Sequence, residues 1–192
     1  ELASIGKFPS DWNLVKLGDF ATVKARIGWR GLSSSEYTSD GPYLIAGRHI
    51  IGSRISWEAC DHISEFRYNE SKEIALEEGD VIISKDGTIG RVGFVENMPG
   101  LATINGTMML IRPDPRYFNQ RFVYYYLQGD YFQRVISEKI SGSSIPHIFQ
   151  RDMVNLWIPI PPKEEQTKAS DFLKLCDDEL DLLQQKLAAL QQ

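Results

Sequence analysis

The chain has 192 residues, of which 42% are hydrophobic and 24% charged, and its formal net charge is -5. This composition is typical of a globular protein and excludes a disordered chain, while the length suits one domain with its own core and excludes two full catalytic domains. The longest apolar runs have the length of a strand and residues 1–10 lack the pattern of a signal peptide, so we expect a cytoplasmic protein without a membrane span. Cys60 and Cys176 lie far apart without zinc-ligand spacing, which predicts neither a disulfide nor a metal site.

Short apolar runs bounded by turn residues occupy the chain up to residue 160. All 15 glycines and all nine prolines lie before residue 163, among runs rich in β-branched residues. The pattern predicts strands over residues 43–45, 81–84, 92–95 and 108–111. We therefore expect a sheet-rich globule within an α+β fold.

Glycines follow the predicted strand 81–84 at positions 87, 90 and 93. Their spacing differs from that of a dinucleotide-binding loop, and residues 92–95 resume strand character instead of beginning a helix. The segment is better interpreted as a hairpin whose tip, residues 85–88, carries one cation and small hydrogen-bonding groups. The glycines at this tip either let a ligand approach the backbone or simply form a tight turn.

Two short helices are expected within the globule. Residues 118–128 end at a glycine, and Asp130 caps a second helix over residues 130–139 with Phe132, Val135 and Ile136 facing inward. The tyrosines at 124–126 are of the kind that stack on nucleic-acid bases. Adjacent helical residues point in different directions, however, so packing in the core is the favoured interpretation.

The composition changes at residues 157–162, after which no glycine or proline occurs. This change divides the chain into a globular domain, residues 1–160, and a long helix, residues 161–192. Apolar residues of this helix alternate at intervals of three and four, the spacing of a coiled-coil seam. We expect the seam to pair with another helix; the alternative is that it folds back on its own domain. The seam comprises Leu173, Cys176, Leu180, Leu183, Leu187 and Leu190.

The sequence contains none of the familiar catalytic motifs, and its three histidines have no partners at motif spacing. Residues 55–80 hold eight acidic and two basic residues, whereas the flanking segments are slightly basic. The overall acidity argues against a protein that holds DNA by charge alone, because nonspecific affinity grows with the number of phosphates neutralised. If the chain binds DNA, we expect a partner to supply part of the contact.

Four segments, taken in order, resemble the specificity subunit of type I restriction-modification systems. They are residues 8–12 (Phe-Pro-Ser-Asp-Trp), 79–90 (Gly-Asp-Val-Ile-Ile-Ser-Lys-Asp-Gly-Thr-Ile-Gly), 142–148 (Gly-Ser-Ser-Ile-Pro-His-Ile) and 158–166 (Ile-Pro-Ile-Pro-Pro-Lys-Glu-Glu-Gln). The last segment, which leads into the long helix, is the most specific. The resemblance covers almost the whole chain.

The resemblance implies a target recognition domain followed by one of the family's conserved helices. Such subunits usually carry two of each, with the helices antiparallel as a spacer, so this chain looks like a half subunit or a fragment. A paired half subunit is expected to bind a symmetric, split site in double-stranded DNA. By the same resemblance the chain performs no chemistry and holds no cofactor. S-adenosylmethionine and ATP belong to the modification and restriction subunits that it guides, and the helix pairs with a second copy or second half and docks the modification subunit.

Under this interpretation, loops on a sheet-rich scaffold read the base sequence, with cations on phosphates or guanine and small polar groups on base edges. Arg67, Arg112 and Arg116 are interpreted as solvated surface charges. Two alternatives remain: an interaction scaffold that uses the coiled coil without sequence-specific DNA binding, and a lone methyltransferase or nuclease, which the missing motifs disfavour. The candidate DNA-binding residues are Lys24, Arg26, Trp29, Arg30, Arg48, Ser84, Lys85, Asp86, Thr88, Ser143, Ser144 and His147.

Overall fold

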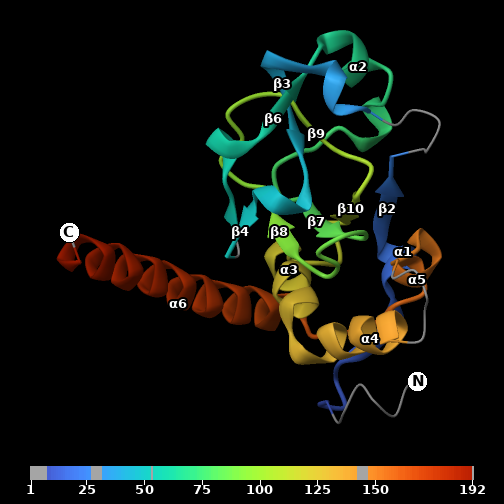
Figure 1. Ribbon diagram of the computed structural model, residues 1–192. Coiled ribbons are helices and arrows are strands. Elements are labelled where there is room, and N and C mark those ends of the chain that lie inside the picture. The colour runs from blue at the N-terminus through green and yellow to red at the C-terminus, as the bar shows by residue number, and fades with distance from the viewer. Residues whose placement is uncertain (1–7, 27–31, 53, 142–146, 192) are drawn as a thin grey trace.

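The computed structural model describes residues 8–26, 32–52, 54–141 and 147–191. It has the expected α+β architecture, with a sheet-rich body and one long helix, α6 (Lys163–Leu190), that projects from it (Figure 1). No helix in these described ranges is long and apolar enough to cross a membrane.

A four-stranded antiparallel sheet forms the centre of the body. Its order is β2 (Ala21–Ala25), β10 (Met108–Pro113), β7 (Val81–Ser84) and β8 (Val92–Phe94). Both faces of the two middle strands are buried: Ile83 and Met109 pack into one hydrophobic core, and Ile82 and Leu110 into another. Burial on both faces explains why the sequence of these strands is continuously apolar instead of alternating.

A smaller layer covers one face of the central sheet. It contains a three-stranded sheet in the order β6 (Asp61–Ile63), β3 (Tyr37–Ile45) and β9 (Ala102–Ile104), in which β3 and β9 are parallel. The short hairpin of β4 (Ile50–Ile51) and β5 (Arg54–Ile55) and the helix α2 (Glu65–Asn69) complete this layer. Short 3-10 helices join the strands: η3 (Ser34–Glu36), η4 (Gly47–His49), η5 (Trp57–Ala59) and η6 (Lys72–Ile74).

Helices cover the other face. The helix predicted over residues 118–128 begins two residues later, as α3 (Gln120–Gln128), because the Asn119 side chain caps it by accepting from the backbone N–H groups of Arg121 and Phe122. Helix α4 (Asp130–Ser141) follows at once. Tyr124 is 2% exposed and packs in the core, so the structure confirms the packing interpretation of this tyrosine.

Strands from the two ends of the globule pair with each other. β1 (Asn13–Lys16) runs antiparallel to β11 (Trp157–Ile160), next to the short helices α1 (Leu17–Phe20) and α5 (Gln150–Val154). The backbone N–H of Leu17 donates to the carbonyl of Leu156 at 2.8 Å, which extends this pairing.

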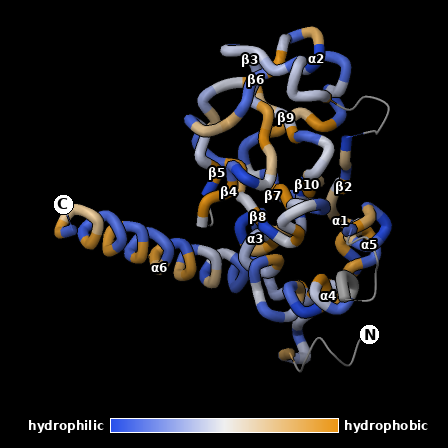
Figure 2. The backbone as a smooth tube through the Cα atoms, in the orientation of Figure 1, coloured by the Kyte–Doolittle hydropathy of each residue, from blue (hydrophilic) through white to orange (hydrophobic). Residues whose placement is uncertain are grey.

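Helix α6 begins at Lys163, two residues after the start of the predicted helix segment at residue 161. Gln166 and Ser170, in its first turns, are each 1% exposed, and Gln166 donates to the carbonyls of Tyr117 and Pro161. The later turns leave the body, and Figure 2 shows hydrophobic residues recurring along them without a covering element. The first turns of α6 pack into the body. The division of the chain at residue 160 into two independent units therefore stays a prediction.

Candidate nucleic-acid interface

The predicted hairpin of β7 and β8 is present, and its tip is a tight turn. Gly87 and Gly90 have φ angles of +71° and +87°, in the left-handed region that side chains disfavour. Inside the turn the hydroxyl of Ser84 donates to the carbonyl of Thr88 and accepts from the backbone N–H of Arg91 at 3.0 Å. Ser84 is fully buried and its hydroxyl holds the turn together, which argues against the predicted contact of this residue with DNA.

Three charged or titratable side chains meet at this tip. Lys85 Nζ lies 2.9 Å from a carboxylate oxygen of Asp86, and the other oxygen contacts Nδ1 of His147. Burial raises the pKa of Asp86, but the hydrogen bonds with Lys85 and His147 lower it by more, so the net pKa lies below the ordinary value. The carboxylate therefore stays charged at neutral pH. The structure thus brings together three of the predicted residues, from segments far apart in the sequence.

A second turn, residues 105–107, packs against the tip of the hairpin. The carbonyl of Thr107 accepts from the backbone N–H groups of Lys85 and Asp86 at 2.9 and 3.3 Å, and Asn105 Oδ1 accepts from the Thr107 hydroxyl at 2.7 Å. A Cβ added at Gly106 would meet nothing within 4 Å, so this turn is open to a ligand. Sequence reasoning missed Asn105 and Thr107, although the Asn-Gly pair at 105–106 is a recognisable turn signal.

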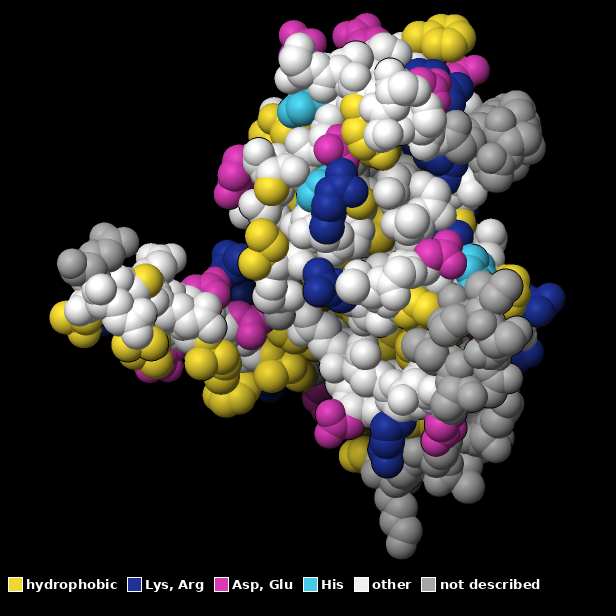
Figure 3. All heavy atoms as spheres, in the orientation of Figure 1, with side chains coloured by type: hydrophobic (Ala, Val, Ile, Leu, Met, Phe, Trp, Pro, Cys, Tyr) yellow, Lys and Arg dark blue, Asp and Glu magenta, His cyan; other side chains and the backbone are white. Residues whose placement is uncertain are grey.

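The 3-10 helix η4 lies against the same tip. A Cβ on Gly47 would sit 3.2 Å from the Thr88 hydroxyl, and Arg91 donates to the carbonyl of Gly47 at 3.3 Å. Arg48, whose side chain is 59% exposed, forms an ion pair with Asp61. We call residues 47–49, 84–91, 105–107 and 147–148 the loop cluster; in Figure 3 the basic side chains on this side of the molecule stand apart instead of forming one continuous patch.

Other predicted DNA-binding residues fall elsewhere. Arg26 is 7% exposed and donates to the carbonyl of Ile104 and to the hydroxyl of Ser71, which argues against the predicted contact of this residue with DNA. Burial lowers its pKa, and its guanidinium acts as an internal support. Lys24 is half-buried on β2, outside the loop cluster. Four candidates lie outside the described residues: Trp29, Arg30, Ser143 and Ser144.

Arg112 is not the solvated charge that the sequence suggested. Its guanidinium makes two hydrogen bonds of 2.7 Å to the carboxylate of Asp80, which is 1% exposed, and a third to the carbonyl of Ala75. Arg116, in contrast, is 78% exposed beside Asp114, as expected for a surface charge.

The predicted seam on α6 faces away from the body. Leu180, Leu183 and Leu187 are 54–57% exposed, and Leu190 more so. Asp177, Asp178 and Asp181 are less exposed than these leucines and lie toward the body. The helix therefore contacts its own domain through polar side chains and leaves its apolar seam uncovered, against the alternative that the seam folds back.

Comparison with known proteins identifies the family. Residues 9–192 match the model of the type I restriction modification DNA specificity domain. The chain belongs to this family. It is 24% identical over 186 residues to the type I restriction enzyme MjaVIII specificity subunit of Methanocaldococcus jannaschii, and 26% identical over 183 residues to the putative MjaX specificity subunit of the same organism. The alignments cover 94% of this chain but only 43% and 40% of those subunits, so the chain spans about two fifths of their length.

Solved structures of specificity subunits share the fold. The HsdS subunit from Thermoanaerobacter tengcongensis matches with a TM-score of 0.67 and 22% identity, over 94% of this chain and 40% of that one. The S subunit from M. genitalium matches with a TM-score of 0.65 and 19% identity, over 94% and 43%. The α+β fold with a long C-terminal helix, predicted from the sequence, is therefore confirmed as the fold of the specificity-domain family.

Proposed function

We propose that the chain is a DNA-recognition half of a type I specificity subunit, which binds one half of a split site and directs partner subunits to it. The family match over residues 9–192 carries this proposal. The structure supports it by separating two surfaces: a polar loop cluster on the body and an apolar seam on α6. One surface suits DNA and the other suits a helix.

The loop cluster suits base edges better than phosphates. Asp86 carries a negative charge, which phosphates repel, but a carboxylate accepts a hydrogen bond from the amino group of cytosine. Lys85 offsets that charge, and the contacts with Lys85 and His147 hold the carboxylate in place. The exposed cations Arg48 and Arg91 flank the tip and supply contacts to phosphates or guanine. Thr88 and Asn105 add small polar groups.

The seam of α6 pairs with a second copy, or with the other half of a longer subunit, and the same helix docks the modification subunit. This chain carries out no reaction and needs no cofactor of its own. The modification subunit supplies S-adenosylmethionine and methylates adenine, and the restriction subunit uses ATP and cleaves DNA.

Co-expression with a type I modification subunit from the same organism tests the proposal. Methylated adenines mapped by sequencing are expected in one split sequence, palindromic if two identical chains pair. A chain carrying both Arg48→Ala and Lys85→Ala should lose this methylation, whereas Arg134→Ala, an exposed change on α4 outside the loop cluster, should retain it. Methyl transfer by the chain alone would contradict the proposal.

The exposed seam also favours a second candidate, a coiled-coil scaffold without DNA specificity. A gel shift separates the two. The recognition half retards its own site in the presence of excess competitor DNA, whereas the scaffold shows no preference among sequences.

A further inference from the structure

Helix α6 touches its own domain at two places. The first is its buried start, where Gln166 and Ser170 pack into the body and Lys163 Nζ contacts the carbonyls of Pro115 and Phe118. The second lies about three turns later, where the helix passes the hairpin of β4 and β5. Among the described residues, every side chain of α6 from Leu182 to its end is exposed.

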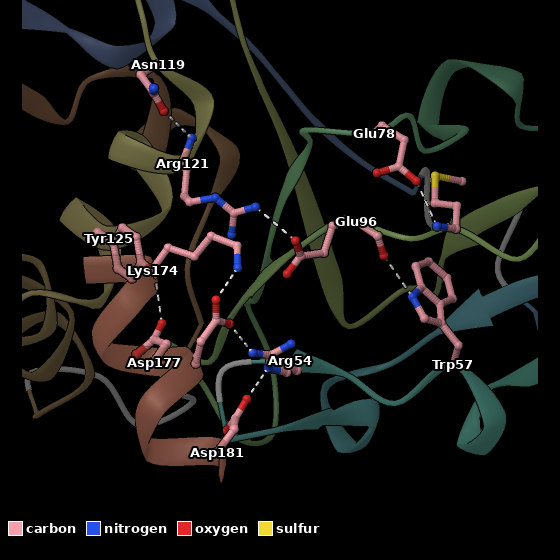
Figure 4. Close-up of polar contacts among 12 residues, drawn as sticks. Arg54, Trp57, Glu78, Glu96, Asn119, Arg121, Tyr125, Lys174, Asp177 and Asp181 are labelled. Carbon is pink, nitrogen blue, oxygen red and sulfur yellow. Dashed lines mark hydrogen bonds and ion pairs between the residues drawn. The ribbon is translucent and has the colours of Figure 1, made fainter. Parts of the chain in front are cut away.

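The second contact consists of ion pairs. Arg54, on β5, places its guanidinium 2.9 Å from the carboxylate of Asp178 and 2.5 Å from that of Asp181 (Figure 4). Lys174 holds Asp178 from within the helix at 2.5 Å. We call Arg54, Asp178 and Asp181 the Arg54 bracket. Nearby, the hydroxyl of Tyr125 on α3 donates to Asp177 at 2.9 Å.

Apolar packing contributes little at this place. A cavity of about 220 Å³ lies between the hairpin and the helix, lined by Ile51 and Gly52 on one side and by Leu180 and Gln184 on the other. Beyond the buried start of α6, the direction of the helix therefore depends on the Arg54 bracket and on the Tyr125 hydrogen bond. Within the described ranges, Arg54 is the only cation of the body that forms an ion pair with Asp178 or Asp181.

A small displacement at the Arg54 bracket produces a larger displacement at the end of α6. At 1.5 Å per residue, Asp181 lies about 16 Å and Leu190 about 30 Å from Ser170, the last buried residue. A sideways shift at Asp181 is thus nearly doubled at the end of α6. Surface ion pairs contribute little to stability, but here a weak contact suffices to select one direction, because no later contact competes with it.

The hairpin that carries Arg54 is tied to the loop cluster. Arg91, at the base of the glycine turn, donates to the carbonyls of Gly47 and Ile50 at 3.3 and 3.5 Å. Ser56, just beyond β5, donates from its backbone N–H to the carbonyl of His49 at 2.9 Å. The hairpin thus contacts the loop cluster through Ile50 and the adjoining Ser56, and it contacts α6 through Arg54.

We infer that Arg54 is a positioning residue that fixes the direction of α6 relative to the loop cluster. On the proposed function, on which this consequence rests, the direction of α6 sets the distance between the two DNA half-sites. Arg54 then determines the length of the spacer that the enzyme accepts, through its ion pairs with Asp178 and Asp181.

Distances between two spin labels test the inference without DNA. One label is placed at Lys72→Cys on the body and the other at Gln185→Cys, on the side of α6 opposite to the seam, in a chain with Cys176→Ala. Cys60 is 7% exposed and its burial raises the pKa of the thiol to about 12, so it does not take up label. Dilution with unlabelled chain removes distances between copies.

We expect one narrow distance distribution for the parent chain. Arg54→Glu, which repels both aspartates, should shift or broaden it, and 1 M salt should broaden it in part. Arg54→Lys, which keeps the charge, and the charge swap Arg54→Glu with Asp181→Arg should restore a narrow distribution. The control Arg134→Glu, an equal change of charge on α4, should leave it unchanged. All variants should melt within a few degrees of the parent, since an exposed ion pair is removed.

A distribution for Arg54→Glu that superimposes on the parent overturns the inference, whatever the DNA experiments show. Methylation assays with the modification subunit then test the consequence. The parent should methylate sites of one spacer length, and Arg54→Glu should also accept spacers one base pair longer or shorter. If Arg54→Glu changes the label distance while the parent shows no sequence-specific methylation, the proposed function fails and the positioning role stands.

Discussion

At the scale of single residues, charges that look alike in the sequence do different work. Arg26 and Arg112 point inward and hold strands and loops, whereas Arg48 and Arg91 are exposed beside the glycine turn. The difference follows from the partners available. A guanidinium is buried only where carbonyls, hydroxyls or a carboxylate satisfy its donors, and such partners come from residues distant in sequence.

Arg112→Met is expected to destabilise the domain by about 2–4 kcal/mol, because it leaves the carboxylate of Asp80 buried without its partner. Burial raises the pKa of Asp80, and the hydrogen bonds from Arg112 oppose that rise. Urea unfolding followed by circular dichroism measures the loss. Arg116→Met, a change at an exposed pair, is the control and should have little effect; an equal loss in both variants would contradict a special role for Arg112.

Lys85→Ala should weaken specific DNA binding of the assembled enzyme by about 10-fold or more. The substitution removes a cation. It also leaves the negative charge of Asp86 without the Lys85 ion pair, so that this charge repels the phosphates more strongly. Competition binding with a labelled site gives the affinity, and sedimentation should show that helix pairing is intact. Unchanged affinity and methylation at the native site would remove Lys85 from the interface.

At the scale of elements, α6 has two faces with separate functions. Its polar side chains meet the body through Gln166, Ser170 and the Arg54 bracket, and its seam stays exposed. An antiparallel pair of such helices aligns Leu180 with Leu183, Cys176 with Leu187 and Leu173 with Leu190 of the second copy. It also brings Glu179 beside Lys186 of the second copy, an ion pair that parallel pairing in register does not form.

This alignment predicts a specific crosslink. Leu187→Cys should give a disulfide-linked dimer on mild oxidation, because its thiol meets Cys176 of the second copy, whereas the unmodified chain should stay unlinked. Gln185→Cys, on the opposite side of the helix, is the matched control. Non-reducing electrophoresis provides the measurement. Rapid crosslinking of the unmodified chain through Cys176 alone would indicate parallel pairing instead.

The sequence predicted elements better than contacts. The hairpin of β7 and β8, the helix α4 and the long helix α6 all follow from local signals such as glycine spacing and heptad spacing, although Asp130, the predicted cap, is the first residue of α4. The loop cluster was found only in part, because the contact between Asp86 and His147 joins segments far apart in the chain. Nothing local distinguishes Ser84, which is buried, from its exposed neighbour Thr88.

At the scale of the whole molecule, the proposed affinity for DNA depends on how many copies of the chain are joined through α6. One loop cluster offers few cations, and the chain is acidic overall, so one copy should bind a half-site weakly. On the proposed function, two copies joined through α6 would bind the second half-site as an intramolecular step, which raises the overall affinity without any new contact.

Leu183→Lys should therefore yield a monomer whose affinity for the full split site falls about 100-fold or more, while its affinity for a single half-site stays the same. A charge placed in the centre of the seam cannot be buried against another helix. Gln185→Lys adds the same charge outside the seam and should pair normally. Light scattering and gel shifts on full and half sites give the comparison. Equal losses on both sites would mean that α6 affects the loop cluster itself.

The pairing of β1 with β11 also governs how the protein folds. β1 cannot pair until β11, which lies just before α6 in the chain, has been synthesised, so the sheet edge beside α1 stays open until nearly all of residues 13–160 have been made. Such long-range contacts slow folding, since the chain between them must be ordered or looped first. Because α6 follows β11 in the chain, its leucines emerge from the ribosome only after β1 and β11 are both available to pair.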